Sequence, residues 1–356
     1  MTARPPIESA AFGACPVPAS RYDVVVLGHG SGGRLSRDLF ESVFSPLLGA
    51  DRALALEDQA TLPFPAEGRL AVTTDAFVVH PLEFPGGDVG SLAVHGTVND
   101  LAVGGARPLY LTASFILEEG LPLSTLARIV ASMKRAADAV PVRVVAGDTK
   151  VVDRGKGDGL FVTTTGVGFV PANVALSATL ARPGDAVVVS GTLGDHGIAI
   201  LAARKGIELD TRLESDSQPL FALCQEVLRA SRNVRCLRDP TRGGLSSALN
   251  EIAAASSVGV RLFEEKLPLR AEVRGACELL GFDPLYVANE GKVVAVVPRE
   301  DAEAVVLAMR RTPAGTDAAV VGEIVEGHPG VVTLRSVVGG ERVVALLAGE
   351  QLPRIC

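Results

Sequence analysis

The residue best suited to covalent chemistry is the last one, Cys356, which follows Pro353, Arg354 and Ile355. A thiol with an ordinary pKa of about 8.5 is intrinsically nucleophilic and can carry a covalently bound group. Ten extended residues before it span about 33–36 Å, far enough to carry such a group between two active sites. A prenylation signal is excluded, because it needs cysteine where Pro353 stands. The end is therefore either a carrier tail or a frayed terminus without function.

Five aspartates lie in segments that we expect at strand ends or in loops: Asp58, Asp75, Asp100, Asp148 and Asp239. Mg²⁺ prefers carboxylate oxygens and bridges the phosphate oxygens of nucleotides. A single aspartate in such a place is usually a turn or helix-cap residue. Five together favour an enzyme that uses a nucleoside triphosphate over a nicotinamide enzyme, which has no need for so many acids.

Other charged residues could move protons or hold phosphate. Lys150 follows Gly147-Asp148-Thr149 and could offset phosphate charge, or it is a solvated surface lysine. Glu290 precedes the strand expected at 292–297 and is either an acid of the site or a turn residue. Isolated histidines such as His29 and His95 are more often structural than catalytic.

A glycine-rich loop, Gly28–Gly33, has the spacing G-x-G-x-x-G between an expected strand at 23–27 and an expected helix at 34–48. This arrangement is typical of dinucleotide-binding domains, and Glu57 and Asp58 follow where a ribose-binding acid would lie. A phosphate loop of another kind or a structural turn fits the same residues.

A second loop, Gly191–Gly197, lies between an expected strand and an expected helix. Backbone N–H groups at a helix start can bind an anion. The loop has no Walker lysine, so it is not a P-loop, and a tight turn is an equal alternative.

Alternating strand and helix patterns fill both halves of the chain and indicate the α/β or α+β class. Strands are expected at 53–56, 70–74, 109–116, 142–145, 160–169, 186–190, 258–262, 292–297, 320–326 and 331–334. Helices are expected at 94–104, 122–140, 197–205, 218–229, 244–255 and 301–311. Proline and glycine within 171–185 mark a boundary between two domains.

Composition excludes several classes of protein. The chain has 356 residues, 47% of them apolar, and a net charge of −7 without a basic patch, which argues against nucleic-acid binding. No apolar run approaches the ~18 residues of a membrane span. The five cysteines include no C-x-x-C pair, so a reducing cytoplasm fits. Residues 1–20 resemble a flexible leader rather than a signal peptide.

Eight segments together resemble the HypE family of hydrogenase maturation proteins, which are carbamoyl dehydratases. They are His29–Gly33, Phe84–Gly87, Phe115–Pro122, Gly147–Val152, Ser190–Gly197, Asp239–Gly244, Ala288–Lys292 and Pro353–Cys356. The resemblance runs from Val24 to Cys356. This family belongs to the ATP-binding superfamily of aminoimidazole ribonucleotide synthetase and selenophosphate synthetase.

The resemblance implies a two-domain PurM-like fold of the α/β (α+β) class, with N-terminal domains that pair across a homodimer. It divides the chain into a leader at 1–20, an ATP-binding and dimerising domain at 21–172, a C-terminal domain at 173–340 and a mobile tail at 341–356. ATP and Mg²⁺ would bind between the domains, with the glycine loop as a mobile element beside ATP.

The resemblance also implies residue roles. The metal-binding acids would be Asp58, Asp75, Asp100, Asp148 and Asp239. ATP would bind at Gly30, Ser31, Gly32, Gly33, Asp75, Asn99, Asp148, Thr149 and Lys150. The catalytic residues would be Cys356, Glu290, Lys150 and His95, with Glu290 as the base that takes a proton from the substrate amide.

The implied reaction starts when a partner carbamoyltransferase, HypF, places a carbamoyl group on Cys356. ATP phosphorylates the amide oxygen, and loss of phosphate and of the nitrogen's protons leaves a thiocyanate. The cyanide then passes to iron on a HypC/HypD scaffold for NiFe hydrogenase. The alternatives are a related enzyme with a soluble substrate, which needs no terminal cysteine, a nucleotide-binding scaffold without turnover, and a Rossmann dehydrogenase.

Overall fold

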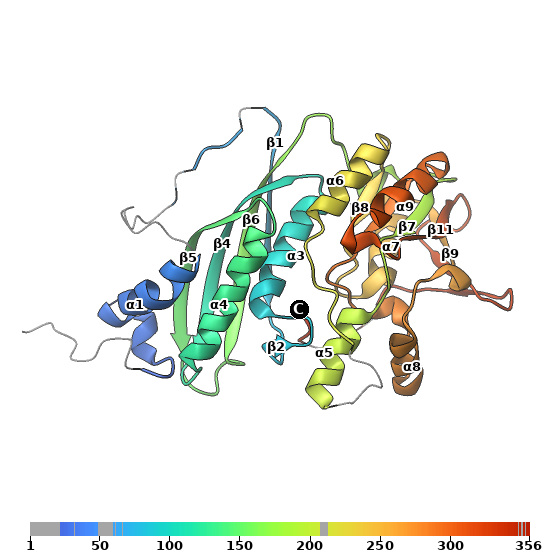
Figure 1. The fold of residues 1–356 in the computed structure, drawn as a ribbon. Coiled ribbons are helices and arrows are strands. Elements are labelled where there is room, and N and C mark those ends of the chain that lie inside the picture. The colour runs from blue at the N-terminus through green and yellow to red at the C-terminus, as the bar shows by residue number, and fades with distance from the viewer. Residues whose placement is uncertain are drawn as a thin grey trace, which may run out of the picture.

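The computed structural model describes residues 22–31, 33–48, 60, 62–65, 67–206, 213–347, 349, 352 and 354–356. Figure 1 shows two units of helices and sheet side by side, with the C-terminal end of the chain between them. In the described part of the chain, no helix is long and apolar enough to cross a membrane.

The first unit is built on a four-stranded sheet whose strands follow the order β1, β6, β4, β5. Their bounds are Arg69–Phe77 for β1, Leu160–Val170 for β6, Arg107–Glu118 for β4 and Arg143–Val152 for β5. Only the β4–β5 pair is parallel, and the other pairs are antiparallel. This topology excludes the Rossmann alternative, which needs a mostly parallel sheet.

Helices cover one face of this sheet. Helix α3 (Val89–Val103) and helix α4 (Leu123–Asp138) lie over it in Figure 1. Side chains alternate between the two faces of a strand, and Leu111, Phe115 and Leu117 of β4 are buried with these helices. On the other face, Leu70 and Val72 of β1 are 61% and 60% exposed, so the described residues leave that face uncovered.

The segment before the glycine-rich loop is not the expected strand. Only Val24 forms a bridge, with Pro122, and the chain then enters a 3₁₀ turn at Leu27–Gly30. Val25 is bonded to the turn after β4, because its N–H donates to Leu121 O and its C=O accepts from Gly120 N. The expected helix at 34–48 is confirmed as α1 (Arg34–Leu39), a π turn and α2 (Ser45–Leu48).

The second unit has a seven-stranded sheet with the order β13, β12, β9, β11, β7, β10, β8. The bounds are β7 Ala186–Val189, β8 Cys236–Arg238, β9 Gly259–Phe263, β10 Val294–Val297, β11 Ala319–Val325, β12 Val332–Arg335 and β13 Glu341–Val343. Helices α6 (Phe221–Ala230) and α9 (Ala302–Arg310) pack against one face, and α7 (Gly244–Ser256) packs against the other.

The sequence patterns missed helix α8 (Ala271–Leu280) and four short strands: β8, β13, β2 (Glu83–Phe84) and β3 (Gly87–Asp88). These strands have only two or three residues each, too few for a periodic pattern to stand out. Helix α8 packs with α5 (Asp195–Lys205) against the core of the first unit, and Leu352 and Ile355 belong to the same cluster. Apolar packing thus joins both units to the end of the chain.

Candidate functional site

The end of the chain is seated between the two units. Ile355 forms an antiparallel bridge with Val79, two residues beyond the end of β1. Val78 N–H donates to Cys356 O at 3.1 Å, and His80 N–H donates to Arg354 O at 3.2 Å. The Ile355 side chain is buried in the shared core, so both backbone pairing and apolar burial hold the tail.

This seat places the Cys356 thiol beside the carboxyl of Glu290, close enough for that carboxyl to change the pKa of the thiol. Burial raises the pKa of the Cys356 thiol, and the negative charge of Glu290 raises it further. The seated thiol is therefore protonated at neutral pH. Because the thiolate is the nucleophilic form, the free thiol is unreactive while it is seated.

Glu290 is held rigidly by its backbone. Its N–H donates to Asp216 Oδ1 at 3.0 Å, and its C=O accepts from Asn99 Nδ2 at 3.1 Å. Burial raises the pKa of Glu290 well above its ordinary value, and the charges of Asp216, Asp239 and Asp75 add to this. Its buried Oε1 has no hydrogen-bond partner among the described residues. Such a carboxyl is a stronger base than an exposed glutamate.

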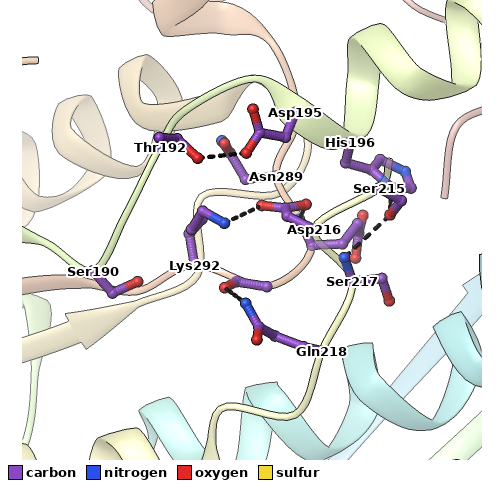
Figure 2. A network of polar contacts seen from close by, with 12 residues as sticks. Ser190, Thr192, Asp195, His196, Ser215, Asp216, Ser217, Gln218, Asn289 and Lys292 are labelled. Atoms are coloured by element: carbon purple, nitrogen blue, oxygen red, sulfur yellow. Dashed lines mark hydrogen bonds and ion pairs between the residues drawn. The ribbon is translucent and has the colours of Figure 1, made fainter. Parts of the chain in front are cut away.

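A buried polar network surrounds Glu290, and Figure 2 shows most of it. Lys292 Nζ lies 3.1 Å from Asp216 Oδ2, and both side chains are almost fully buried. Asn289 Oδ1 accepts from Gly194 N at 2.7 Å, while Asn289 Nδ2 donates to Pro240 O at 3.0 Å. Asn289 therefore ties the loop before α5 to the loop after β8.

The loop Gly191–Gly197 begins α5 with a hydrogen-bonded acid rather than an open anion site. Thr192 donates to Asp195 Oδ2, and Arg270 Nε lies 3.4 Å from the same oxygen. Burial raises the pKa of Asp195. A carboxylate at this helix start competes with any anion, so the tight-turn alternative fits the loop better.

Three of the expected acids meet where the two units face each other. Thr73 Oγ1 donates to Asp100 Oδ2 at 2.6 Å. Burial, together with the charge of Asp100, raises the pKa of Asp75 to about 6 and that of Asp239 to about 7. The charge of Arg242 lowers the pKa of Asp75, so the guanidinium lies close to this group. Asp75 and Asp100 lie inside β1 and α3 rather than at the element ends expected from the sequence.

A cavity of about 780 Å³ opens beside these acids. Its lining includes Val72 and Thr73 of β1, Asp100 of α3, Asp239 after β8, and Arg242. The described residues contain no closed group of three or more His, Cys, Asp or Glu side chains around a metal position. Mg²⁺ usually keeps several waters and binds through one or two carboxylates plus substrate phosphates. Acids whose pKa values are raised by burial and by each other's charge fit such an open cation site.

Asp148, Thr149 and Lys150 are not brought to this site by the fold of the single chain. They lie inside β5 rather than at a strand end, and Asp148 and Lys150 project from the uncovered face of the sheet. Asp75 projects from the helix-covered face of β1, three strands away, or about 14 Å. Lys150 Nζ lies 3.4 Å from Asp148 Oδ2 in an exposed pair.

The glycine-rich loop, Gly28–Gly33, packs against β5, the strand that carries Asp148 and Lys150. A Cβ at Gly30 would lie 2.5 Å from Val151 N, so only glycine fits there. Ser31 Oγ donates to Gly28 O at 2.9 Å, and Gly33 precedes α1. Gly32 and Asp58 lie outside the described residues.

His95 and Asn99 are four residues apart on α3 and face the second unit. His95 Nδ1 lies 3.0 Å from Ser217 Oγ, and burial lowers the pKa of His95 to about 4. Asn99 Nδ2 donates to Gln218 O and Glu290 O, and Asn99 Oδ1 accepts from Leu220 N. Both amide hydrogens of Asn99 therefore bind backbone carbonyls of the second unit. No side-chain donor of Asn99 is left for a nucleotide.

Four residues of the site were not expected from the sequence: Asp216, Arg242, His196 and Lys292. The last three lie in segments that the resemblance singled out, so their motifs could have suggested them. Asp216 lies in an irregular segment before α6 that carries no motif. Its contacts with Glu290 and Lys292 reveal it.

The comparisons with known proteins agree with this architecture. The family of AIR synthase related proteins matches twice, as its N-terminal domain at residues 56–170 and its C-terminal domain at residues 182–335. The carbamoyl dehydratase HypE of Cupriavidus necator is 53% identical over 330 residues, which cover 93% of this chain and 94% of that protein.

Two solved structures are similar over most of their length. The crystal structure of the hydrogenase maturation protein HypE in complex with ATP is 45% identical, with a TM-score of 0.87, and the match covers 93% of this chain and 99% of that chain. HypE in a HypE–HypF complex is 46% identical, with a TM-score of 0.76 over 78% of this chain and 90% of that chain. These matches confirm the resemblance and the two-domain PurM-like α/β fold.

Proposed function

Because this chain belongs to the HypE family of carbamoyl dehydratases, we propose that it uses ATP to dehydrate a carbamoyl group carried on Cys356. The observation that carries this proposal is the seated tail, which puts the Cys356 thiol beside the buried carboxyl of Glu290. A carrier thiol and a proton acceptor are thus next to each other in a largely buried site.

The reaction follows from the chemistry of the adduct. The amide oxygen of Cys356–S–CO–NH₂ is a poor leaving group, and its attack on the γ-phosphorus of ATP releases ADP and makes it a good one. Loss of two protons from nitrogen and cleavage of the C–O bond then give Cys356–S–C≡N and phosphate. Glu290 takes one of the protons, and its raised pKa suits this role.

The acids beside the cavity fit the phosphate end of ATP. Asp75, Asp100 and Asp239 would hold Mg²⁺, which when bound neutralises phosphate charge. The solved HypE–ATP complex supports ATP as the nucleotide. Arg242 would sit between the acids and Cys356, since its charge lowers the pKa of Asp75, Glu290 and Cys356.

Replacing Asp239 with asparagine is expected to stabilise the nucleotide-free protein at neutral pH. The folded pKa of Asp239 is about 7, so between pH ~4 and ~7 the folded state holds a proton that the unfolded state has lost. Parent stability therefore falls as pH rises through this window, and the variant escapes that loss. We expect a gain of about 1–2 kcal/mol above pH ~7 that vanishes near pH ~4, measured by denaturant unfolding at several pH values. The same variant should lose ATP-dependent dehydration. Equal pH profiles of stability for parent and variant would contradict the assignment.

The chain would act as a homodimer that pairs through the uncovered sheet face. Leu70, Val72 and Ile116 are exposed on that face although they are large and apolar, as expected of a surface that binds a partner. Asp148 and Lys150 project from the same face. Pairing would bring Asp148 and Lys150 toward the partner subunit. This would explain why they lie far from Asp75 of their own chain.

Mixing two inactive variants tests whether Lys150 acts across this interface. Lys150→Ala and Glu290→Gln protomers each lack one function, but a mixed dimer would contain one complete site if Lys150 acts on the partner subunit's tail. Random exchange makes half the dimers mixed, so recovery should reach about a quarter of parent activity. If Lys150 acts within its own protomer, mixing restores nothing. Lys156→Ala mixed with Glu290→Gln is the control and should give parent-like sites from the Lys156→Ala protomers alone.

The reaction places the protein among partners of the same pathway. The carbamoyl group would come from HypF, as the solved HypE–HypF complex supports, and the cyanide would pass to iron on HypC/HypD in the cytoplasm.

Intact-mass measurement with HypF, carbamoyl phosphate, ATP and Mg²⁺ tests the proposal. A carbamoyl adduct on the C-terminal peptide that loses one water with ATP is expected. ATP hydrolysis without an adduct would favour a soluble substrate, and neither event would favour a scaffold.

A further inference from the structure

A fully buried histidine of the second unit, His196, contacts the tail at Ile355, and Figure 2 shows its ring beside Ser215. Its Nε2 lies 2.6 Å from Ile355 O, and its Nδ1 lies 2.8 Å from Ser215 Oγ. A carbonyl oxygen only accepts hydrogen bonds, so Nε2 carries the proton. Burial lowers the pKa of His196 and keeps the ring neutral, so Nδ1 accepts from the Ser215 hydroxyl.

The ring is fixed from several sides. Ser215 Oγ accepts in turn from Ser217 N at 3.1 Å, which aims its hydroxyl at His196. The Phe84 ring packs edge-on against the imidazole, with centroids 5.9 Å apart. The Nε2–H group is therefore fixed so that it points toward the carbonyl of Ile355, one residue before Cys356.

We propose that His196 is a positioning residue that holds the tail in its reactive seat by donating from Nε2 to Ile355 O, with Ser215 fixing the tautomer. The other contacts of the seat use the opposite side of the tail. Val78 and His80 pair with Cys356 and Arg354 along the backbone, and Arg204 reaches the carbonyls of His80 and Arg354. Only His196 binds the carbonyl of Ile355 among the described contacts, so its loss leaves that oxygen buried and unpaired.

The rate of Cys356 alkylation measures how often the tail leaves its seat, and the experiment needs no partner protein. The seated thiol is protonated and only partly exposed, so iodoacetamide should react faster when the tail leaves its seat. Losing a hydrogen bond to a buried carbonyl should increase the unseated population, and His196→Ala should alkylate Cys356 about fivefold faster or more at neutral pH. His196→Gln should restore most of the protection, because the glutamine amide carries a donor near the position of Nε2. Ser215→Ala should lie between parent and His196→Ala.

Three buried cysteines separate local release from unfolding. Cys224, Cys236 and Cys277 are at most 2% exposed, and peptide mapping after alkylation follows each of them with Cys356. Faster alkylation of Cys356 alone supports the proposal. Parent-like alkylation of Cys356 in His196→Ala would overturn it. Equal acceleration at all four cysteines would mean global loosening, and the milder variant Ser215→Ala then decides: faster alkylation of Cys356 alone supports the proposal, and parent-like alkylation overturns it.

A second readout rests on the proposed function. Transfer by HypF needs the tail outside, so His196→Ala should accept the carbamoyl group at least as fast as the parent but dehydrate it more slowly. If the parent itself takes up no carbamoyl group, the proposed function fails while the alkylation result still tests the seat. If the parent dehydrates normally and both His196→Ala rates match it, the role of His196 is refuted.

Discussion

Cys356→Ala protein incubated with HypF, carbamoyl phosphate and ATP is expected to gain no mass on its C-terminal peptide. The reason is the absence of the atom that forms the C–S bond, so the loss should be complete rather than partial. The seated tail supports this, since Cys356 is the thiol that contacts Glu290. Intact-mass measurement with peptide mapping gives the result directly.

Cys277→Ala is the matched control for this loss. Cys277 is a buried cysteine that packs between α8 and the shared core, and its thiol takes no part in the proposed reaction. The control variant should be carbamoylated and dehydrated at the parent rate once its folding is verified. A Cys356→Ala protein that still accepts one carbamoyl group would mean that another residue is the carrier.

Glu290→Gln protein should accept the carbamoyl group normally and then fail to dehydrate it. A placed general base contributes about 10²–10⁴-fold to rate, and glutamine cannot take the proton. Glutamine keeps the shape of the side chain, and the backbone bonds of residue 290 to Asp216 and Asn99 do not involve it. Single-turnover measurement starting from carbamoylated protein isolates this step from transfer.

The pH dependence gives the Glu290 assignment a second, independent measurement. A base works only when deprotonated, and the pKa of Glu290 is raised well above its ordinary value by burial and neighbouring acids. The parent dehydration rate should therefore rise with pH through that raised pKa, while the residual rate of Glu290→Gln should not follow this rise. The exposed Glu278→Gln serves as control and should keep the parent profile. Parent-like dehydration by Glu290→Gln would remove Glu290 from the reaction.

The sequence predicted the fold class and most of the long elements because their periodic patterns extend over many residues. Helices α4 and α7 were expected at nearly their observed positions. The strand expected at 23–27 was wrong, since its apolar residues pack at a turn instead of along a neighbouring strand. Strands β8 and β13 were missed because three residues cannot show a period.

By itself the sequence determined which side chains could do chemistry: a terminal cysteine, five aspartates and a family pattern that links them. Alternation along β5 shows that Asp148 and Lys150 share one face, but only the packing of α3 and α4 decides that this face is the uncovered one. Likewise the contact between His196 and Ile355 joins residues 159 positions apart. Such contacts depend on how two sheets and a tail are packed together, and local patterns carry no information about that.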